Sequence, residues 1–171
     1  MKTNQSNHPN PKRRGELIEM AFMVKAVAEG YLVCVPYGDS QPYDFILDSG
    51  HQFARVQVKS TERLRKGGYL IGACHFSSGG TKWPYTAREI DYLAVCIVPE
   101  KAWYIIPVQA FTPQKWLSFY PHNQGSRGRF ERFREAWCQM SCPNAGTTSC
   151  PLQPGHTVPE PCALPKHPKR Q

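Results

Sequence analysis

The sequence predicts one α/β domain, because a single helical pattern near its start is followed by several runs of strand type. Apolar residues recur at helical spacing over residues 15–30. Later runs, of which residues 92–98 and 103–106 are the most apolar, are rich in β-branched and aromatic residues. With 171 residues and a hydrophobic fraction of 40%, the chain is long enough to bury one core. We therefore expect one globular unit with polar ends.

Composition divides the chain into three regions. Residues 1–14 are polar and basic and are expected to form a flexible arm, whereas residues 15–140 carry the apolar runs and form the predicted domain. Residues 141–171 contain seven prolines and few apolar residues. Burial cannot offset the entropy of ordering such a segment, so a disordered tail is expected. The alternative is a zinc site, although the spacing fits no familiar zinc pattern. Its ligands would be Cys138, Cys142, Cys150, Cys162 and His156.

The helical pattern is expected to end at Gly30, because glycine stops helices well. Glu16 and Glu19 lie three residues apart within it and therefore project from nearly the same face. A β-branched strand over residues 31–35 follows, and the turn formers of residues 37–42 make a loop.

Two strands joined by an Asp-Ser-Gly-His turn give the strongest hairpin pattern in the chain. A turn centred near Gly50 puts Asp44 across from about Val56 and beside Gln57. Side chains alternate along a strand, so Gln57 and Lys59 share one face. Asp44, Gln57 and Lys59 are thus expected to meet at one end of the hairpin.

The later elements are predicted from composition in the same way. Near the end, Phe130, Phe133 and Trp137 fall on one helical face, which predicts a packing helix with a basic outer surface over residues 127–137. Between the hairpin and residue 127, the sequence predicts a basic loop at 63–68, an apolar strand at 69–76, a Gly- and Ser-rich loop at 77–83, and two pairing strands at 92–98 and 103–106.

Charge and composition narrow the class of partner. The net charge of +8 favours a polyanion such as DNA over an acidic small molecule. The first residues do not resemble a signal peptide, and no apolar stretch is long enough to span a membrane. We expect a cytoplasmic protein that has no membrane association.

The hairpin residues and the helix glutamates suit the hydrolysis of a phosphodiester bond. Mg²⁺ prefers oxygen ligands and retains several waters, so one or two carboxylates and a few neutral oxygens are enough. Asp44 is the primary candidate ligand and Glu19 the second carboxylate. The side-chain oxygen of Gln57 and the carbonyl of Val58 are candidate neutral ligands. Lys59 would orient the attacking water or hold the scissile phosphate.

These residues stand in three segments with the sequences GELIEMAF (15–22), VPYGDSQPYDF (35–45) and RVQVKS (55–60). Their succession resembles the PD-(D/E)xK nuclease superfamily, and most closely the branch of group I intron-associated homing endonucleases, which is related to archaeal Holliday-junction resolvases. The resemblance covers about residues 12–137. It implies a restriction-endonuclease-like core with a mixed four-stranded sheet flanked by helices. That core begins helix, strand, strand, strand, the order that the residue patterns also predict.

The resemblance also implies roles for single residues. Asp44 matches the metal-binding aspartate and Lys59 the catalytic lysine. Gln57 stands where most members have Asp or Glu, a departure that this branch tolerates. Glu19 best matches the helix glutamate, and Glu16 is the alternative. The neutral Gln57 removes one negative charge from the metal site, which weakens Mg²⁺ binding unless Glu19 compensates.

Each of these residues also has a structural interpretation. Asp44 lies in a turn-rich segment, where aspartate is common. Lys59 would protect an edge strand against aggregation, and one of the two helix glutamates would only stabilise the helix dipole. Other residues are interpreted as structural from the outset: Tyr85, Asp91, Trp83, Trp103, Trp116 and Trp137.

The leading hypothesis is a DNA endonuclease that depends on Mg²⁺, with Mn²⁺ as a substitute. The alternative is a DNA-binding module with a nuclease-like fold and no activity, and a third is an interaction protein that binds no DNA. A homo-oligomer, dimer or tetramer, is expected because cutting both strands calls for two sites. Candidate contacts to DNA phosphates are Arg13, Arg14, Arg63, Arg65, Lys66, Arg127 and Arg129.

Overall fold

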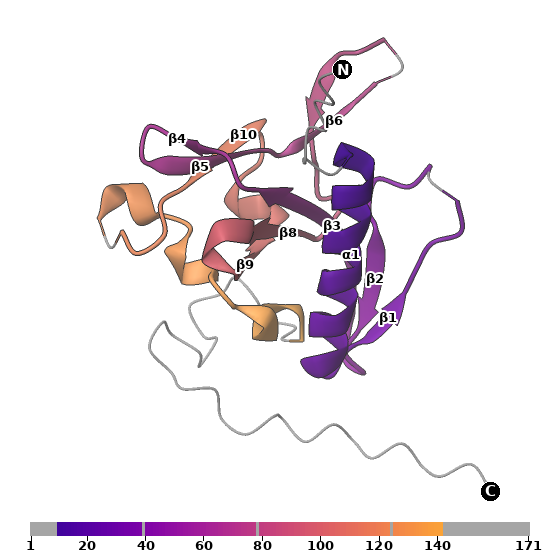
Figure 1. Ribbon diagram of the computed structural model, residues 1–171. Coiled ribbons are helices and arrows are strands. Elements are labelled where there is room, and N and C mark those ends of the chain that lie inside the picture. Colours follow the sequence, from indigo (N-terminus) through magenta and orange to yellow (C-terminus); the bar gives the residue numbers. More distant parts are fainter. Residues whose placement is uncertain (1–9, 39, 78, 124, 142–171) are drawn as a thin grey trace, which may run out of the picture.

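A computed structural model of the chain describes residues 10–38, 40–77, 79–123 and 125–141. Within these residues, a single α-helix, α1 (Pro11–Ala28), precedes a five-stranded sheet (Figure 1). The order of the sheet is β1-β2-β3-β8-β9, and β3 pairs with β8 in parallel while the other pairs are antiparallel. The strands are β1 (Leu32–Cys34), β2 (Phe45–Asp48), β3 (Phe53–Thr61), β8 (Tyr92–Ile97) and β9 (Ala102–Pro107).

The predicted α/β fold and the order helix, strand, strand, strand are confirmed, but two details differ. The mixed sheet has five strands rather than four. The described residues supply one α-helix, so the second face is covered by a small sheet and short 3-10 turns instead of helices. The small sheet has the order β10-β5-β4, and a separate ribbon pairs β6 with β7.

The remaining elements are short. The outer strands are β4 (Leu64–Arg65), β5 (Gly68–Gly72), β6 (Cys74–Phe76), β7 (Lys82–Pro84) and β10 (Trp116–Phe119). The 3-10 turns are η1 (Val98–Glu100), η2 (Val108–Ala110), η3 (Ser126–Gly128), η4 (Glu131–Phe133) and η5 (Trp137–Met140). No helix in the described part of the chain combines the length and apolarity needed to cross a membrane.

The central strands bury side chains on both faces of the sheet. Phe22 and Ala26 of α1 pack on one face, together with Val56 and Val58 of β3. Leu93 and its alternate neighbours on β8 belong to a second core on the other face, under the small sheet. This double burial explains why β8 and β9 are continuous apolar runs rather than alternating ones.

Helix α1 begins earlier than the pattern predicted. The side chain of Asn10 accepts a hydrogen bond from the amide of Lys12 at 3.0 Å, and Pro11 occupies the first turn, where its missing N–H costs nothing. Residues 11–14, assigned to the flexible arm, are therefore helical. Residues 1–9 of that arm and residues 142–171 of the expected tail lie outside the described residues, and with them four of the five ligands of the zinc alternative.

The helix predicted over residues 127–137 is wrong. Phe130 and Phe133 pack in the core under the small sheet, whereas Trp137 packs in the core under α1. The chain between them crosses from one core to the other, with Glu135 in the left-handed region at φ 49°. The periodic spacing of three aromatic residues reflects two cores rather than one helical face.

Candidate active site

The β2–β3 hairpin brings the predicted residues together. Phe45 pairs with Val56, so Asp44 lies across from Gln57, one residue away from the predicted register. The amide of Asp44 donates to the carbonyl of Val56 at 2.9 Å and extends the ladder. Because Val56 packs under α1, the alternating Gln57 and Lys59 lie on the opposite face of β3.

Asp44 is held by neutral donors. Its Oδ2 atom accepts hydrogen bonds from Nε2 of Gln57 at 2.6 Å and from the amide of Val58 at 2.7 Å. Burial raises the pKa of Asp44 above its ordinary value, and the hydrogen bond from Val58, the charge of Lys59 and the hydrogen bond from Gln57 oppose this rise. The result is a partly desolvated carboxylate whose nearest partners carry no formal charge.

Glu19 of α1 joins this group electrostatically. Its pKa is raised first by burial and then by the negative charge of Asp44, while Lys59 lowers it. Glu16 makes the smallest contribution to this shift, and its side chain is exposed to solvent. Of the two helix glutamates, Glu19 is the one that is partly buried and coupled to Asp44 and Lys59.

The carboxylates of Asp44 and Glu19 suit a divalent cation that keeps much of its hydration. The part of the chain that the structure describes contains no cluster of three or more His, Cys, Asp or Glu side chains suited to a metal ion. Two coupled carboxylates with raised pKa values are nevertheless what a nearby cation would stabilise, and Mg²⁺ requires few protein ligands. Gln57 turns its nitrogen toward Asp44 and, at 3.3 Å, toward the carbonyl of Val58. It therefore acts here as a donor that orients Asp44.

Tyr85, which is expected from its sequence context to be structural, also lies near the site. Its side chain is almost fully buried and stacks on His75 with the ring centroids 5.4 Å apart. Burial raises the pKa of its hydroxyl, and the charge of Asp44 is the next cause. Tyr85 is 41 positions along the chain from Asp44, so no local pattern could have placed the two residues together.

Some of the basic residues predicted to contact DNA are free to do so. Arg63, Arg65 and Lys66 are exposed around β4 and the turn into β5. This turn is tight, because Lys66 and Gly67 both have positive φ angles, of 51° and 76°. Arg13 is exposed on the first turn of α1.

The other three arginines have partners in the chain. Arg14 forms an ion pair with Glu62 at 2.6 Å. The guanidinium groups of Arg127 and Arg129 lie over the rings of Tyr120 and Phe130, at 5.9 and 4.4 Å from the ring centroids. These three arginines can reach a phosphate only by sharing or leaving their present contacts.

An exposed cluster of aromatic residues and one lysine lies beside the β6–β7 ribbon, which projects from the body of the domain (Figure 1). Nζ of Lys82 lies 4.5 Å from the ring centroid of Trp116 and 5.4 Å from that of Phe76. Trp116 is 50% exposed and Phe76 65%, and Trp83 of the same ribbon is also exposed. The sequence assigned Trp83 and Trp116 to a core or interface, and they are not in the core.

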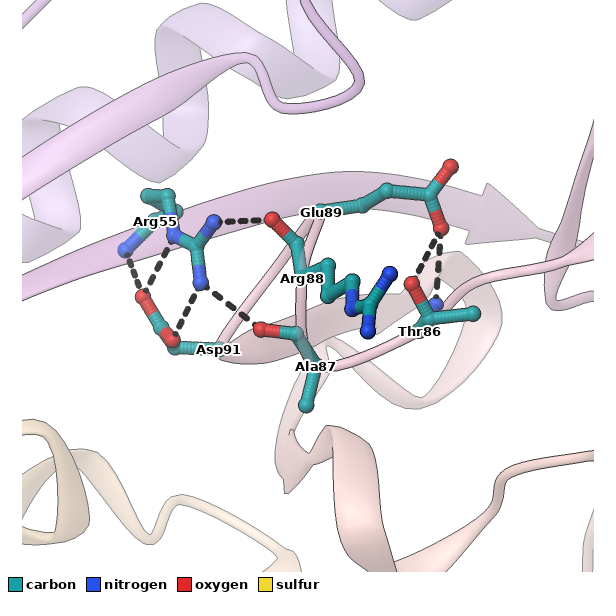
Figure 2. A network of polar contacts seen from close by, with 6 residues as sticks. All are labelled: Arg55, Thr86, Ala87, Arg88, Glu89 and Asp91. Carbon is teal, nitrogen blue, oxygen red and sulfur yellow. Dashed lines mark hydrogen bonds and ion pairs between the residues drawn. The ribbon is translucent and has the colours of Figure 1, made fainter.

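A second polar network lies two residues from Gln57 on the same strand (Figure 2). Arg55 binds Asp91 through Nε at 3.0 Å and Nη2 at 2.9 Å, and its amide donates to the same carboxylate at 2.8 Å. The guanidinium also donates to the carbonyls of Ala87 and Arg88. The network fastens residues 86–91 to the sheet beside the candidate site.

Comparisons with known proteins identify a matching family and similar folds. A family model described as PD-(D/E)XK endonuclease matches residues 9–136. The structure of a bacterial homing endonuclease, I-Ssp6803I, superposes with a TM-score of 0.67 and 22% identity, over 77% of this chain and 93% of that chain. The Holliday junction resolvase Hjc of the archaeal hyperthermophile Archaeoglobus fulgidus gives a TM-score of 0.43 and 18% identity, over 63% of this chain and 84% of that chain. A comparison with curated proteins found no match.

Proposed function

Because the chain belongs to the PD-(D/E)XK endonuclease family, we propose that it hydrolyses phosphodiester bonds of DNA with a divalent metal ion, at the site around Asp44. The observation that carries the proposal is the pair of coupled carboxylates. Asp44 is partly desolvated without an ion pair to any described residue, and its charge reaches Glu19 on α1. Such an arrangement costs stability unless a cation or a substrate uses it.

In this proposal, Asp44 and Glu19 hold Mg²⁺, for which Mn²⁺ can substitute, and the carbonyl of Val58 is a further candidate ligand. A metal ion bound there would supply a water of lowered pKa and polarise a phosphoryl oxygen. Gln57 fixes the carboxylate of Asp44 through the 2.6 Å hydrogen bond, and would ligate through Oε1 only if its amide turned over. Lys59 is close enough to affect the pKa of both carboxylates, and its ammonium group would hold the scissile phosphate or orient the attacking water.

DNA would be held by charge and by aromatic surface. The exposed basic turn of Arg63, Arg65 and Lys66 suits phosphate contacts, and Arg13 is a further candidate. Lys82 of the projecting β6–β7 ribbon lies over the exposed ring of Trp116 on β10, so the two side chains offer a cation beside a stacking surface. Arg14, Arg127 and Arg129 remain candidates that would have to loosen their contacts in the chain.

An inactive DNA-binding module is the second candidate function. Gln57 favours it, because this side chain donates a hydrogen bond to Asp44 and adds no negative charge for a cation. Such a module would bind DNA in a salt-sensitive way through its basic residues and would give no product with any metal.

Cleavage of supercoiled plasmid with and without Mg²⁺ or Mn²⁺ tests the proposal. Wild-type protein should nick or linearise the plasmid only with metal, and Asp44→Ala and Lys59→Ala should each abolish the product. Asp48→Asn, at the other end of β2, and Lys101→Ala, at the exposed residue that follows η1, are matched controls that should cut normally. Metal-independent cleavage, or full activity of both site variants, would contradict the site assignment. Salt-sensitive binding without any product would support the inactive module.

A further inference from the structure

Tyr85 combines a deeply buried ring with a free hydroxyl. The residue is 2% exposed, and no hydrogen bond joins its hydroxyl to another group in the described part of the chain. Among the described residues, no side-chain oxygen or nitrogen is both fully enclosed and unbonded, so the small exposed surface of Tyr85 includes its hydroxyl oxygen. Because a buried tyrosine usually has a partner for its hydroxyl, this one is available to a bound ligand.

The ring of Tyr85 is fixed by its neighbours. It stacks on His75 with the ring centroids 5.4 Å apart, and Nε2 of His75 lies 3.1 Å from Oε1 of Glu89. The other oxygen of Glu89 accepts hydrogen bonds from the amide and the hydroxyl of Thr86, at 2.9 and 2.8 Å (Figure 2). The carbonyl of Tyr85 accepts a hydrogen bond from Oγ1 of Thr112 at 2.9 Å. The hydroxyl therefore projects from a ring that has little freedom to move.

Two features place this hydroxyl at the candidate site. Residues 86–91, which follow Tyr85 directly, are fastened to β3 by Arg55. Burial is the largest cause of the raised pKa of Tyr85, and the charge of Asp44 is the next, ahead of the charge of Glu89. The hydroxyl and the Asp44 carboxylate therefore interact through space, although the carboxylate takes its side-chain hydrogen bonds from other described residues.

The chemistry of this hydroxyl is that of a neutral donor. The pKa of a tyrosine is ordinarily near 10, and here burial and a nearby negative charge raise it further, so the proton stays on the oxygen at neutral pH. A protonated hydroxyl binds well to an anionic oxygen. A DNA phosphate offers such oxygens, and a neutral donor can bind one of them without repelling a cation at Asp44.

We propose that the hydroxyl of Tyr85 donates a hydrogen bond to a non-bridging oxygen of the phosphate that is cut. This inference rests on the proposed function for the identity of that phosphate, and it deepens the proposed function by adding a binding residue. The new residue comes directly after β7, whereas the hairpin and α1 supply the others. A contact with the DNA backbone carries no sequence information, so it applies to any DNA.

Tyr85→Phe removes the hydroxyl and keeps the ring on His75. Binding of a fluorescent DNA duplex, measured with Ca²⁺ in place of Mg²⁺, should weaken about tenfold, because a hydrogen bond to a charged oxygen is lost. The slope of log affinity against log salt should stay as in wild type, because the hydroxyl carries no charge. The melting temperature should not fall, since no hydrogen bond between described residues is removed.

Tyr31→Phe is the matched control. Tyr31 is 4% exposed, and its hydroxyl donates to the carbonyl of Trp137 at 2.6 Å and accepts from Oγ of Ser141 at 2.6 Å. Its loss should lower the melting temperature and leave the DNA affinity of the folded protein unchanged. Unchanged DNA affinity of Tyr85→Phe overturns the proposal, and so does an equal loss of affinity in both variants.

A plasmid assay separates a phosphate contact from support of Asp44. Tyr85→Phe should cut more slowly than wild type and need the same Mg²⁺ concentration for half-maximal cleavage. A higher Mg²⁺ requirement with unchanged DNA affinity overturns the proposal, because Tyr85 would then act through Asp44. If the wild-type protein cuts no plasmid with any metal, the proposed function fails, while the affinity of Tyr85→Phe still decides whether the hydroxyl contacts DNA. Wild-type protein that binds no DNA overturns both.

Discussion

Asp44 and Asp91 both accept hydrogen bonds from side chains of strand β3. Gln57 donates to Asp44, and Arg55, two residues earlier on the strand, donates to Asp91. Asp91 is paired with a guanidinium through two side-chain hydrogen bonds and also accepts the amide of Arg55. Asp44 accepts hydrogen bonds from an amide side chain and a backbone amide, and burial raises its pKa. The carboxylate of Asp91, whose charge is balanced by Arg55, fastens a loop. The carboxylate of Asp44 has no ion pair to a described residue and is available for a cation.

The comparison also fixes the sign of each contribution to stability. An acid whose pKa is higher in the folded protein than in the unfolded chain binds its proton more tightly when folded. Ionised Asp44 therefore opposes folding at neutral pH, and the penalty disappears as the pH falls through its raised pKa. The charge of Asp91 is balanced by Arg55, whose Nη2 lies 2.9 Å from Oδ1 of Asp91.

Asp44→Asn should reduce activity more than any other change and should not destabilise the folded protein. Removing the carboxylate should reduce cleavage by on the order of 10³-fold, because the electrostatic stabilisation that it supports is lost. The melting temperature at neutral pH should stay the same or rise, since a desolvated charge is removed. Plasmid cleavage and a thermal melt measure the two quantities. A strongly destabilised variant would show that Asp44 is structural, like Asp91.

Magnesium should stabilise the wild-type protein in the absence of DNA. At a free concentration of 100 times its dissociation constant, a ligand that binds only the folded state adds about 2.7 kcal/mol. The corresponding rise in melting temperature should be missing from Asp44→Asn and retained in Asp91→Asn. The rise should weaken at acidic pH, where the raised pKa values of Asp44 and Glu19 favour their neutral forms. Equal shifts in both variants would place the metal elsewhere.

Arg55→Ala should affect stability and spare the chemistry. The change removes the guanidinium that donates to Asp91 and to the carbonyls of Ala87 and Arg88, while the amide of residue 55 still donates to Asp91. Because this network is partly exposed, we expect a loss of about 2 kcal/mol. For a chain of this size that corresponds to about 4–8 °C in melting temperature. Arg88→Ala is the matched control, because Arg88 enters the network through its carbonyl (Figure 2). Below the melting range, the activity per folded molecule should remain near that of wild type. A selective loss of cleavage would give Arg55 a role at the site.

Local patterns predicted the hairpin and the three residues that it brings together, because a tight turn and a period of two act over a few residues. The register was off by one, since the structure closes a loop of four residues between Asp48 and Phe53, where Ser49 binds Gln52. Tyr85 could not be predicted to approach Asp44, because that approach depends on how the ribbon joins the sheet. The incorrect helix over residues 127–137 has a similar cause: spacing does not reveal that its aromatic residues serve two cores.

Gln57→Glu should give the smallest effect on cleavage. The variant tests whether the neutral side chain at position 57 weakens metal binding. A glutamate there cannot donate to Asp44 Oδ2 while ionised, so the two carboxylates would repel each other without metal. Bound cation would relieve the repulsion, and the Mg²⁺ concentration for half-maximal cleavage should fall by about tenfold, within the range that neighbours of a metal ligand typically control. Gln57→Leu is the control, because it removes the hydrogen bond without adding charge. Should Gln57→Glu cut no better at low Mg²⁺ than Gln57→Leu, orientation of Asp44 by the amide, rather than the missing charge, would be what position 57 contributes.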